Sequence, residues 1–103
     1  MSTVVYEVNL SINKNTVESF KDWLSEHIAE MLSQKGFLGA KVYECEAPPE
    51  QNEKVELAVH YEVDSRENLQ FYFDHNAEKM RSQGLQKFAG EFSASRRILN
   101  HIS

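Results

Sequence analysis

The chain has 103 residues, of which 41% are hydrophobic and 26% are charged, and its formal net charge is −5 at pH 7. The length fits one domain, and the composition is typical of a soluble globular protein. A protein that binds nucleic acid needs a concentration of basic side chains, and the 11 Lys and Arg residues form no basic run. A nucleic-acid partner is therefore not expected.

Three features of the sequence bear on location. Cys45 is the single cysteine, so an intramolecular disulfide is impossible and nothing indicates an oxidising compartment. The N-terminal residues lack the cationic segment and apolar stretch of a signal peptide. No apolar run approaches the ~20 residues that a membrane helix needs. We expect a cytoplasmic protein without a membrane partner.

The first half of the chain predicts a strand, a helix and a second strand. Apolar and polar residues alternate over residues 4–12, which predicts a strand with one buried face. Asn15 or Thr16 can cap the helix that follows, in which apolar residues recur with helical spacing from Val17 to about Ser33. Gly36 predicts the helix stop. A second strand is expected near residues 40–46, followed by a loop at 47–53 with two prolines.

The second half repeats the order. Residues 55–63 alternate as clearly as the first strand, and Asp64 or Ser65 can cap a second helix. That helix carries Leu69, Tyr72, Phe73 and Met80 on its inner side, and Gly84 is expected to break or bend it. The last strand is expected at residues 92–99.

The order β-α-β-β-α-β predicts the fold class. Right-handed crossovers favour an α+β, ferredoxin-like sandwich, with both helices on one face of a four-stranded antiparallel sheet of strand order 4-1-3-2. Residues 1–103 would form this single domain. The first and third strands are then central neighbours whose apolar sides meet the helices. The expected core is Val4, Tyr6, Val8, Leu10, Val55, Leu57, Val59 and Tyr61 against Phe20, Leu24, Ile28, Leu69 and Phe73.

Two segments carry a family resemblance. HIAEMLSQKGF (27–37) resembles the signature HIPxxLxxGxF of a family of small bacterial proteins of unknown function, domain-of-unknown-function family four-two-eight-six. YFDHNAEKMRSQGLQKFAGEFSASRRIL (72–99) resembles its closing segment, a helix of the type HAPxLRxxxxxxF and a strand with the pattern FxxxRxxL. The chain departs from the signature at Ala29, where proline is frequent, and at Asn76, which separates His75 from Ala77.

That family is similar to the dimeric α+β barrel group, in which two ferredoxin-like subunits pack sheet to sheet. The resemblance implies a homodimer, in a group that includes cofactor-free monooxygenases and haem-degrading enzymes. In the haem-degrading members the axial histidine lies toward the end of the second helix. The corresponding segment here, AEKMRSQ (77–83), has no histidine, so we expect no haem and no other cofactor. No zinc-type spacing of His, Cys or Asp is present either, so no metal is expected.

The candidate ligand-binding residues lie on the polar side of the two central strands. Strand parity places Glu7 and Asn9 beside His60 and Glu62 on the sheet face away from the helices. One of Arg96 and Arg97 should join them, because adjacent residues point to opposite faces, and Arg97 is the one favoured. Glu56 and Glu62 flank His60 along its face and would favour its charged form. The alternative is that this face is simply solvated.

A second candidate pair lies on the first helix. Trp23 and His27 are one turn apart at the margin of its apolar stripe, whereas Glu26 and Glu30 point to the other side. This pair can be an active-site arrangement, but it can equally be the rim that seals the helix against the sheet. Catalysis would need a hydrogen-bonding partner for His27, and the sequence offers none.

The sequence favours a homodimeric, non-enzymatic domain that binds a small molecule or a protein partner through the polar sheet face. The alternative is a cofactor-independent monooxygenase or isomerase that uses the same face in a dimer cavity, with His60 as base and an arginine or Asn9 polarising the substrate. Glu62 and His27 are weaker catalytic candidates. A third possibility is purely structural association, with the polar face open to solvent.

Overall fold

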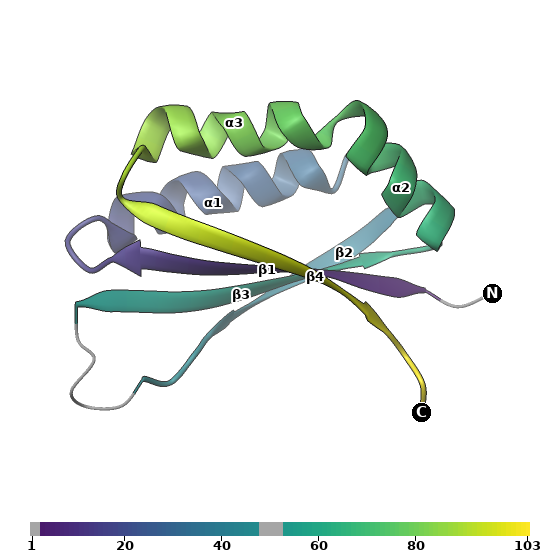
Figure 1. Cartoon of the computed structure of the whole chain (residues 1–103), viewed down its shortest axis with the longest axis horizontal. Helices are drawn as coiled ribbons and strands as arrows, with labels where there is room; N and C mark the ends of the chain where they lie inside the picture. Colours follow the sequence, from purple (N-terminus) through teal and green to yellow (C-terminus); the bar gives the residue numbers. More distant parts are fainter. Residues whose placement is uncertain (1–2, 48–52) are drawn as a thin grey trace.

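The computed structural model describes residues 3–47 and 53–103, so most of the loop expected at 47–53 lies outside the described residues. The described part forms one sheet and three helices (Figure 1). In chain order the elements are β1 (Val4–Asn13), α1 (Val17–Met31), β2 (Phe37–Glu44), β3 (Lys54–Val63), α2 (Arg66–His75), α3 (Ala77–Phe88) and β4 (Phe92–Asn100).

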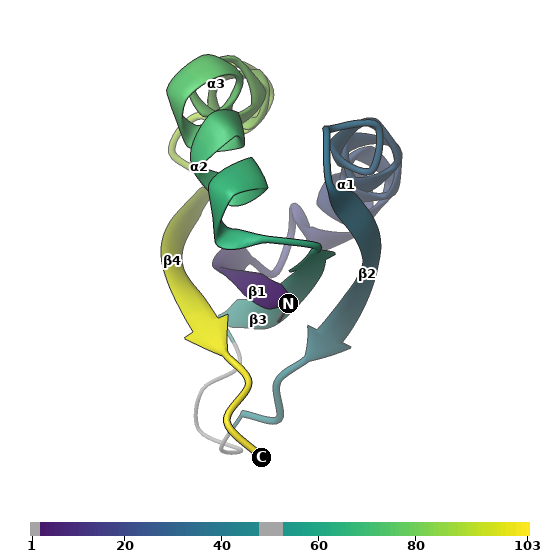
Figure 2. The same ribbon diagram turned by 90° about the vertical axis from the view of Figure 1, so that its right-hand side faces the viewer.

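The four strands form one antiparallel sheet in the order β2-β3-β1-β4, which is the expected order read from the opposite edge. The ferredoxin-like fold class is therefore confirmed. All helices lie on one side of the sheet, as the end-on view in Figure 2 shows. The β1–β3 register pairs Tyr6 with Tyr61, Glu7 with His60 and Val8 with Val59, so each face keeps the parity predicted from the sequence.

The second crossover differs from the prediction because it consists of two helices. The helix is interrupted at Asn76, between α2 and α3. The side-chain amide of Asn76 donates a hydrogen bond of 2.9 Å to Gln34 Oε1 in the turn after α1. Gly84, the expected break, lies inside α3 instead. A Cβ added at Gly84 would lie 3.0 Å from Cη2 of Trp23, so this glycine makes room for the indole rather than ending a helix.

Ser65, one of the two predicted caps, does cap α2, with its hydroxyl accepting a hydrogen bond of 3.1 Å from the Asn68 backbone N–H. Two other element ends differ from the prediction. Thr16 precedes α1 without a side-chain cap bond. Strand β2 begins at Phe37, three residues before the expected start. The reason is packing: Phe37 is 7% exposed, and its ring lies 5.3 Å from that of Tyr72.

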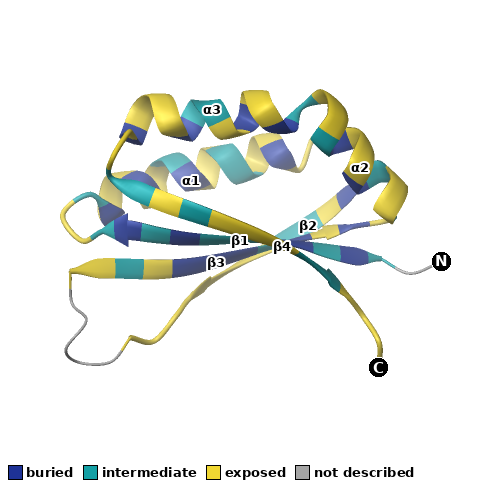
Figure 3. Cartoon of the chain, viewed as in Figure 1, coloured by how far each residue is buried: buried dark blue, intermediate teal, exposed yellow. Residues whose placement is uncertain are grey.

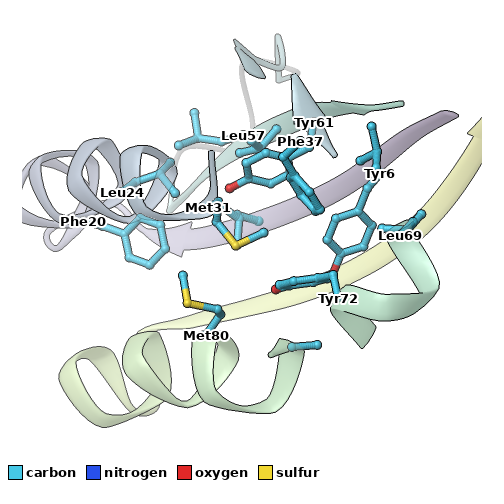
Figure 4. Close-up of a cluster of buried hydrophobic side chains, with 14 of the residues drawn as sticks. Tyr6, Phe20, Leu24, Met31, Phe37, Leu57, Tyr61, Leu69, Tyr72 and Met80 are labelled. Carbon is cyan, nitrogen blue, oxygen red and sulfur yellow. The ribbon is translucent and has the colours of Figure 1, made fainter. Parts of the chain in front are cut away.

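The hydrophobic core fills the space between the helices and the sheet. Figure 3 shows the central strands mostly buried and the outer surfaces of the helices exposed. Three buried tyrosines, Tyr6, Tyr61 and Tyr72, stand among the aliphatic side chains and contact one another through their rings (Figure 4). None of the helices in the described ranges is long and apolar enough to cross a membrane.

Candidate functional site

A row of four polar side chains crosses the sheet on the face away from the helices. The strand register aligns Lys41 of β2, His60 of β3, Glu7 of β1 and Arg97 of β4, and we call these four residues the Glu7 row. Glu7 Oε1 accepts hydrogen bonds from Arg97 Nε at 2.5 Å and from Asn9 Nδ2 at 2.7 Å. Its Oε2 lies 2.8 Å from His60 Nε2. Three neighbours therefore share one carboxylate.

Glu7 is only 5% exposed, although no helix covers this face. The hydrogen bond from Arg97, followed by that from Asn9, lowers its pKa to about 2; His60 contributes as well, and burial opposes them. Glu7 in turn raises the pKa of Arg97. The carboxylate is thus ionised at neutral pH, and three hydrogen bonds already engage its two oxygens.

The carboxylate that pairs with His60 differs from the expectation. Glu56 accepts a hydrogen bond of 3.1 Å from the Ser11 hydroxyl instead. Glu62 is exposed, lies opposite Val5 in the next row, and makes no hydrogen bond or ion pair with another described side chain. The partner of His60 is Glu7, on the neighbouring strand.

The structure therefore gathers Glu7, Asn9, His60 and Arg97, and it leaves Glu62 apart. The two arginines separate as expected. Arg97 lies opposite Glu7, whereas Arg96 lies opposite Val8 and so belongs to the helix side of the sheet. No group of three or more His, Cys, Asp or Glu side chains within residues 3–47 and 53–103 is arranged to hold a metal ion.

A pocket of about 50 Å³ lies on the helix side, between the sheet and helices α1 and α3. Trp23 and His27 both line it, with ring centroids 4.6 Å apart and ring planes inclined by 23°. Nδ1 of His27 is buried and has no hydrogen-bond partner in the described part of the chain. Burial lowers the pKa of His27, against the opposing influence of Gln83 and Glu30. The pair is therefore part of a pocket wall and more than an outer rim.

Sequence reasoning missed five polar residues that line the same pocket: Tyr6, Tyr61, Tyr72, Arg81 and Arg96. The parity of Tyr61 and the helical spacing of Tyr72 indicated core positions, which is correct, but these patterns carry no information about where a hydroxyl points. Strand parity places only one of Arg96 and Arg97 on the polar face, which leaves the other, Arg96, on the helix side. The sequence signal that could have indicated this pocket is a polar residue at a position that strand parity or helical spacing assigns to the inner face.

Solved structures with the same fold come from several sources. A dimeric ferredoxin-like protein from an uncultured marine organism superposes with a TM-score of 0.75 at 11% identity, covering 100% of this chain and 98% of the other. The cofactor-independent oxygenase SnoaB from Streptomyces nogalater gives a TM-score of 0.70 at 9% identity, covering 100% and 96%. An ethyl tert-butyl ether d (EthD) family protein from Bacillus halodurans gives 0.67 at 20% identity, covering 96% and 99%.

At these identities the likeness shows the fold alone. No curated protein matches the sequence. The family comparison agrees with the resemblance carried by the segments 27–37 and 72–99. The model described as "Domain of unknown function (DUF4286)" matches residues 3–102, and the chain belongs to this family.

Proposed function

We propose that the chain is a homodimeric, non-enzymatic binding protein that associates through the sheet face opposite the helices. The observation that supports this most is the state of Glu7, a charged carboxylate that is 5% exposed on a face without a helix. Covering a charged group is costly unless the group is paired and hydrogen-bonded. Arg97, Asn9 and His60 already provide this pairing, so a second molecule can cover Glu7 without leaving a buried charge uncompensated.

The charges on this face suit a second copy of the same chain. The paired strands place three cations and three carboxylates on it, so the face is neutral although the whole chain carries a charge of −5. A two-fold interface brings one surface against itself and needs such self-complementarity. The residues are Lys41, Lys54 and Arg97, and Glu7, Glu56 and Glu62.

A small polar ligand held between the two sheets would contact the groups around Glu7. Arg97 has a side chain that is 65% exposed, and Nε is the nitrogen that binds Glu7, which leaves the ends of the guanidinium for a ligand. Asn9, His60 and Glu62 complete the contact set, while Glu7 fixes the orientation of its neighbours. Concave sites with a few converging polar groups are the usual place for such ligands.

Sedimentation equilibrium with a matched pair of charge reversals tests the homodimer. Glu62→Lys changes the proposed interface from neutral to +2, and we expect the dimer dissociation constant to rise at least tenfold. Glu26→Lys makes the same change on the exposed side of α1, and we expect it to leave the dimer intact. A wild-type chain that is monomeric at micromolar concentration would contradict the proposal. So would equal effects of the two reversals.

A second candidate is a cofactor-independent oxygenase or isomerase that uses the same face. The observation that favours it is the 2.8 Å contact between His60 Nε2 and Glu7, because a general base needs an orienting partner. Such a base also needs shielding from water, and the His60 side chain is 31% exposed in the single chain. A crystal structure of the dimer decides this point. If bulk water still reaches His60 Nδ1 there, this candidate is removed.

A further inference from the structure

One buried polar atom in the wall of the helix-side pocket lacks a partner. It is Nδ1 of His27, which has no hydrogen-bond partner among the described residues. Tyr61 and Tyr72, each 2% exposed, line the same pocket, and Figure 4 shows both of their oxygen atoms directed toward the side of the core where Met31 and Met80 lie. A buried polar group without a partner calls for an explanation, and a pocket with this nitrogen and two hydroxyl-bearing side chains in its wall supplies one.

Two arginines give this pocket a positive character in an acidic protein. Arg81 of α3 donates a hydrogen bond of 3.2 Å from Nη2 to the hydroxyl of Tyr6, and Arg96 of β4 also lines the pocket; both residues are otherwise exposed. No Asp or Glu lines the pocket. Within the described residues neither arginine has an acidic partner at ion-pair distance. A guanidinium without a carboxylate partner favours an anion.

The protonation states of the neighbouring groups agree with an anionic occupant. Burial raises the pKa of Tyr61 and of Tyr72, so both hydroxyls remain protonated and can donate. Burial lowers the pKa of His27, with a smaller contribution in the same direction from the charge of Arg96. The donors available to a ligand are therefore the two hydroxyls and the guanidinium groups.

We propose that this pocket binds the carboxylate group of a small organic acid, with Tyr61, Tyr72 and Arg96 as its donors. The volume of about 50 Å³ exceeds what one water molecule needs and falls well short of the roughly 150 Å³ cavity that takes a benzene ring. It fits a carboxylate with one further carbon atom, which would contact the apolar wall formed by Met31, Met80 and Val59. The site lies on the opposite side of the sheet from the proposed dimer face, so the two proposals can fail separately.

The chain reports on this pocket through its single tryptophan, because Trp23 lines the wall. We expect titration with sodium acetate at constant ionic strength to give a saturable change in fluorescence, with half-saturation below about 10 mM. Acetamide has nearly the same shape without the charge, and it should bind at least tenfold more weakly. Equal binding of the two compounds, or no saturation by acetate, would overturn the proposal.

Two substitutions locate the binding. Tyr61→Phe removes one hydroxyl and keeps the ring, and Arg96→Gln removes one charge; each should weaken acetate binding about tenfold. Lys87→Gln removes a cation from the same helix as Arg81 but outside the pocket, and it should leave the affinity unchanged. If Lys87→Gln weakens binding as much as Arg96→Gln does, the effect is general electrostatics and the site assignment is wrong.

Tyr61→Phe has a second readout that needs no ligand. The Tyr61 hydroxyl borders the pocket, so its removal should leave the midpoint of thermal unfolding of the free protein unchanged. A lower midpoint would show that the hydroxyl already has a structural partner, and it would count against the proposal even if acetate binds.

Discussion

The two faces of the sheet hold their polar groups in opposite states. On the face without helices, Glu7 accepts hydrogen bonds from three side chains, and the network is complete within one chain. Beneath the helices, Nδ1 of His27 is buried without a partner among the described residues, and His27 lines the same pocket as Tyr61 and Tyr72. A conspicuous cluster of charges is thus already satisfied, whereas the incomplete hydrogen bonding lies in the apolar interior. A search for ligands should begin with the incomplete groups.

Among the tests of this contrast, we expect the largest effect from removal of the Glu7 carboxylate. Glu7→Ala leaves Arg97, His60 and Asn9 without their shared acceptor on a partly buried surface. We expect the free energy of unfolding, measured by urea denaturation, to fall by about 2 kcal/mol. Glu62→Ala is the control from the same face, and its effect should stay within about 0.5 kcal/mol because Glu62 makes no contact of this kind. Similar losses in both variants would mean that Glu7, Asn9, His60 and Arg97 do not form a stabilising network.

The same interaction should be visible as a loss of stability in acid. The folded-state pKa of Glu7 is about 2, below its ordinary value of 4.5. A carboxylate with a depressed pKa stabilises the fold above its unfolded-state pKa, and this contribution is lost as the pH falls toward the folded-state value. We therefore expect the wild-type chain to lose more stability between pH 4.5 and pH 2 than Glu7→Gln does. If stability falls by the same amount between pH 4.5 and pH 2 in the wild type and in Glu7→Gln, the loss in acid does not come from Glu7.

The sequence predicts one face of this comparison much better than the other. Period-two alternation in the first and third strands places Glu7, Asn9 and His60 on the polar side, because strand parity is a local property. The pairing of Glu7 with His60 needs the exact register, and that is set by crossovers and core packing that alternation does not encode. Local flanking charges suggested Glu56 and Glu62 as partners of His60, and the cross-strand neighbour took their place.

The spacing of apolar residues in the sequence could not predict the helix-side pocket. Spacing places Tyr61 and Tyr72 in the core, but the direction of a hydroxyl depends on side-chain rotamers and on the rings packed around it. The helix break is another tertiary effect. Glycine lowers helix propensity by about 1 kcal/mol, which predicted a break at Gly84, yet the space that Gly84 leaves for Trp23 keeps α3 continuous there.

Substituting the two histidines should change stability in opposite directions. His27→Phe keeps an aromatic ring against Trp23 and removes a buried nitrogen without a partner, so we expect the free energy of unfolding to rise by about 1 kcal/mol. His60→Phe removes a hydrogen bond to Glu7, and we expect a fall of about 1 kcal/mol. Chemical denaturation of both variants and of the wild type gives the sign of each change in the free energy of unfolding. A fall in both would show that His27 has a partner in solution.

The smallest effect is expected near neutral pH and belongs to His27. Burial lowers its pKa below 6.5, so the unfolded chain takes up a proton at a higher pH than the folded chain does. The neutral ring therefore contributes stability above pH 6.5 that is lost as the pH falls, and the influence of Gln83 and Glu30 keeps this loss small. His27→Phe should flatten the stability profile between pH 7 and pH 5 and leave the loss below pH 4.5 in place, because that loss belongs to Glu7. If the variant retains the wild-type slope between pH 7 and pH 5, another group titrates there, and the contrast between an incomplete interior and a completed outer face loses its support at this residue.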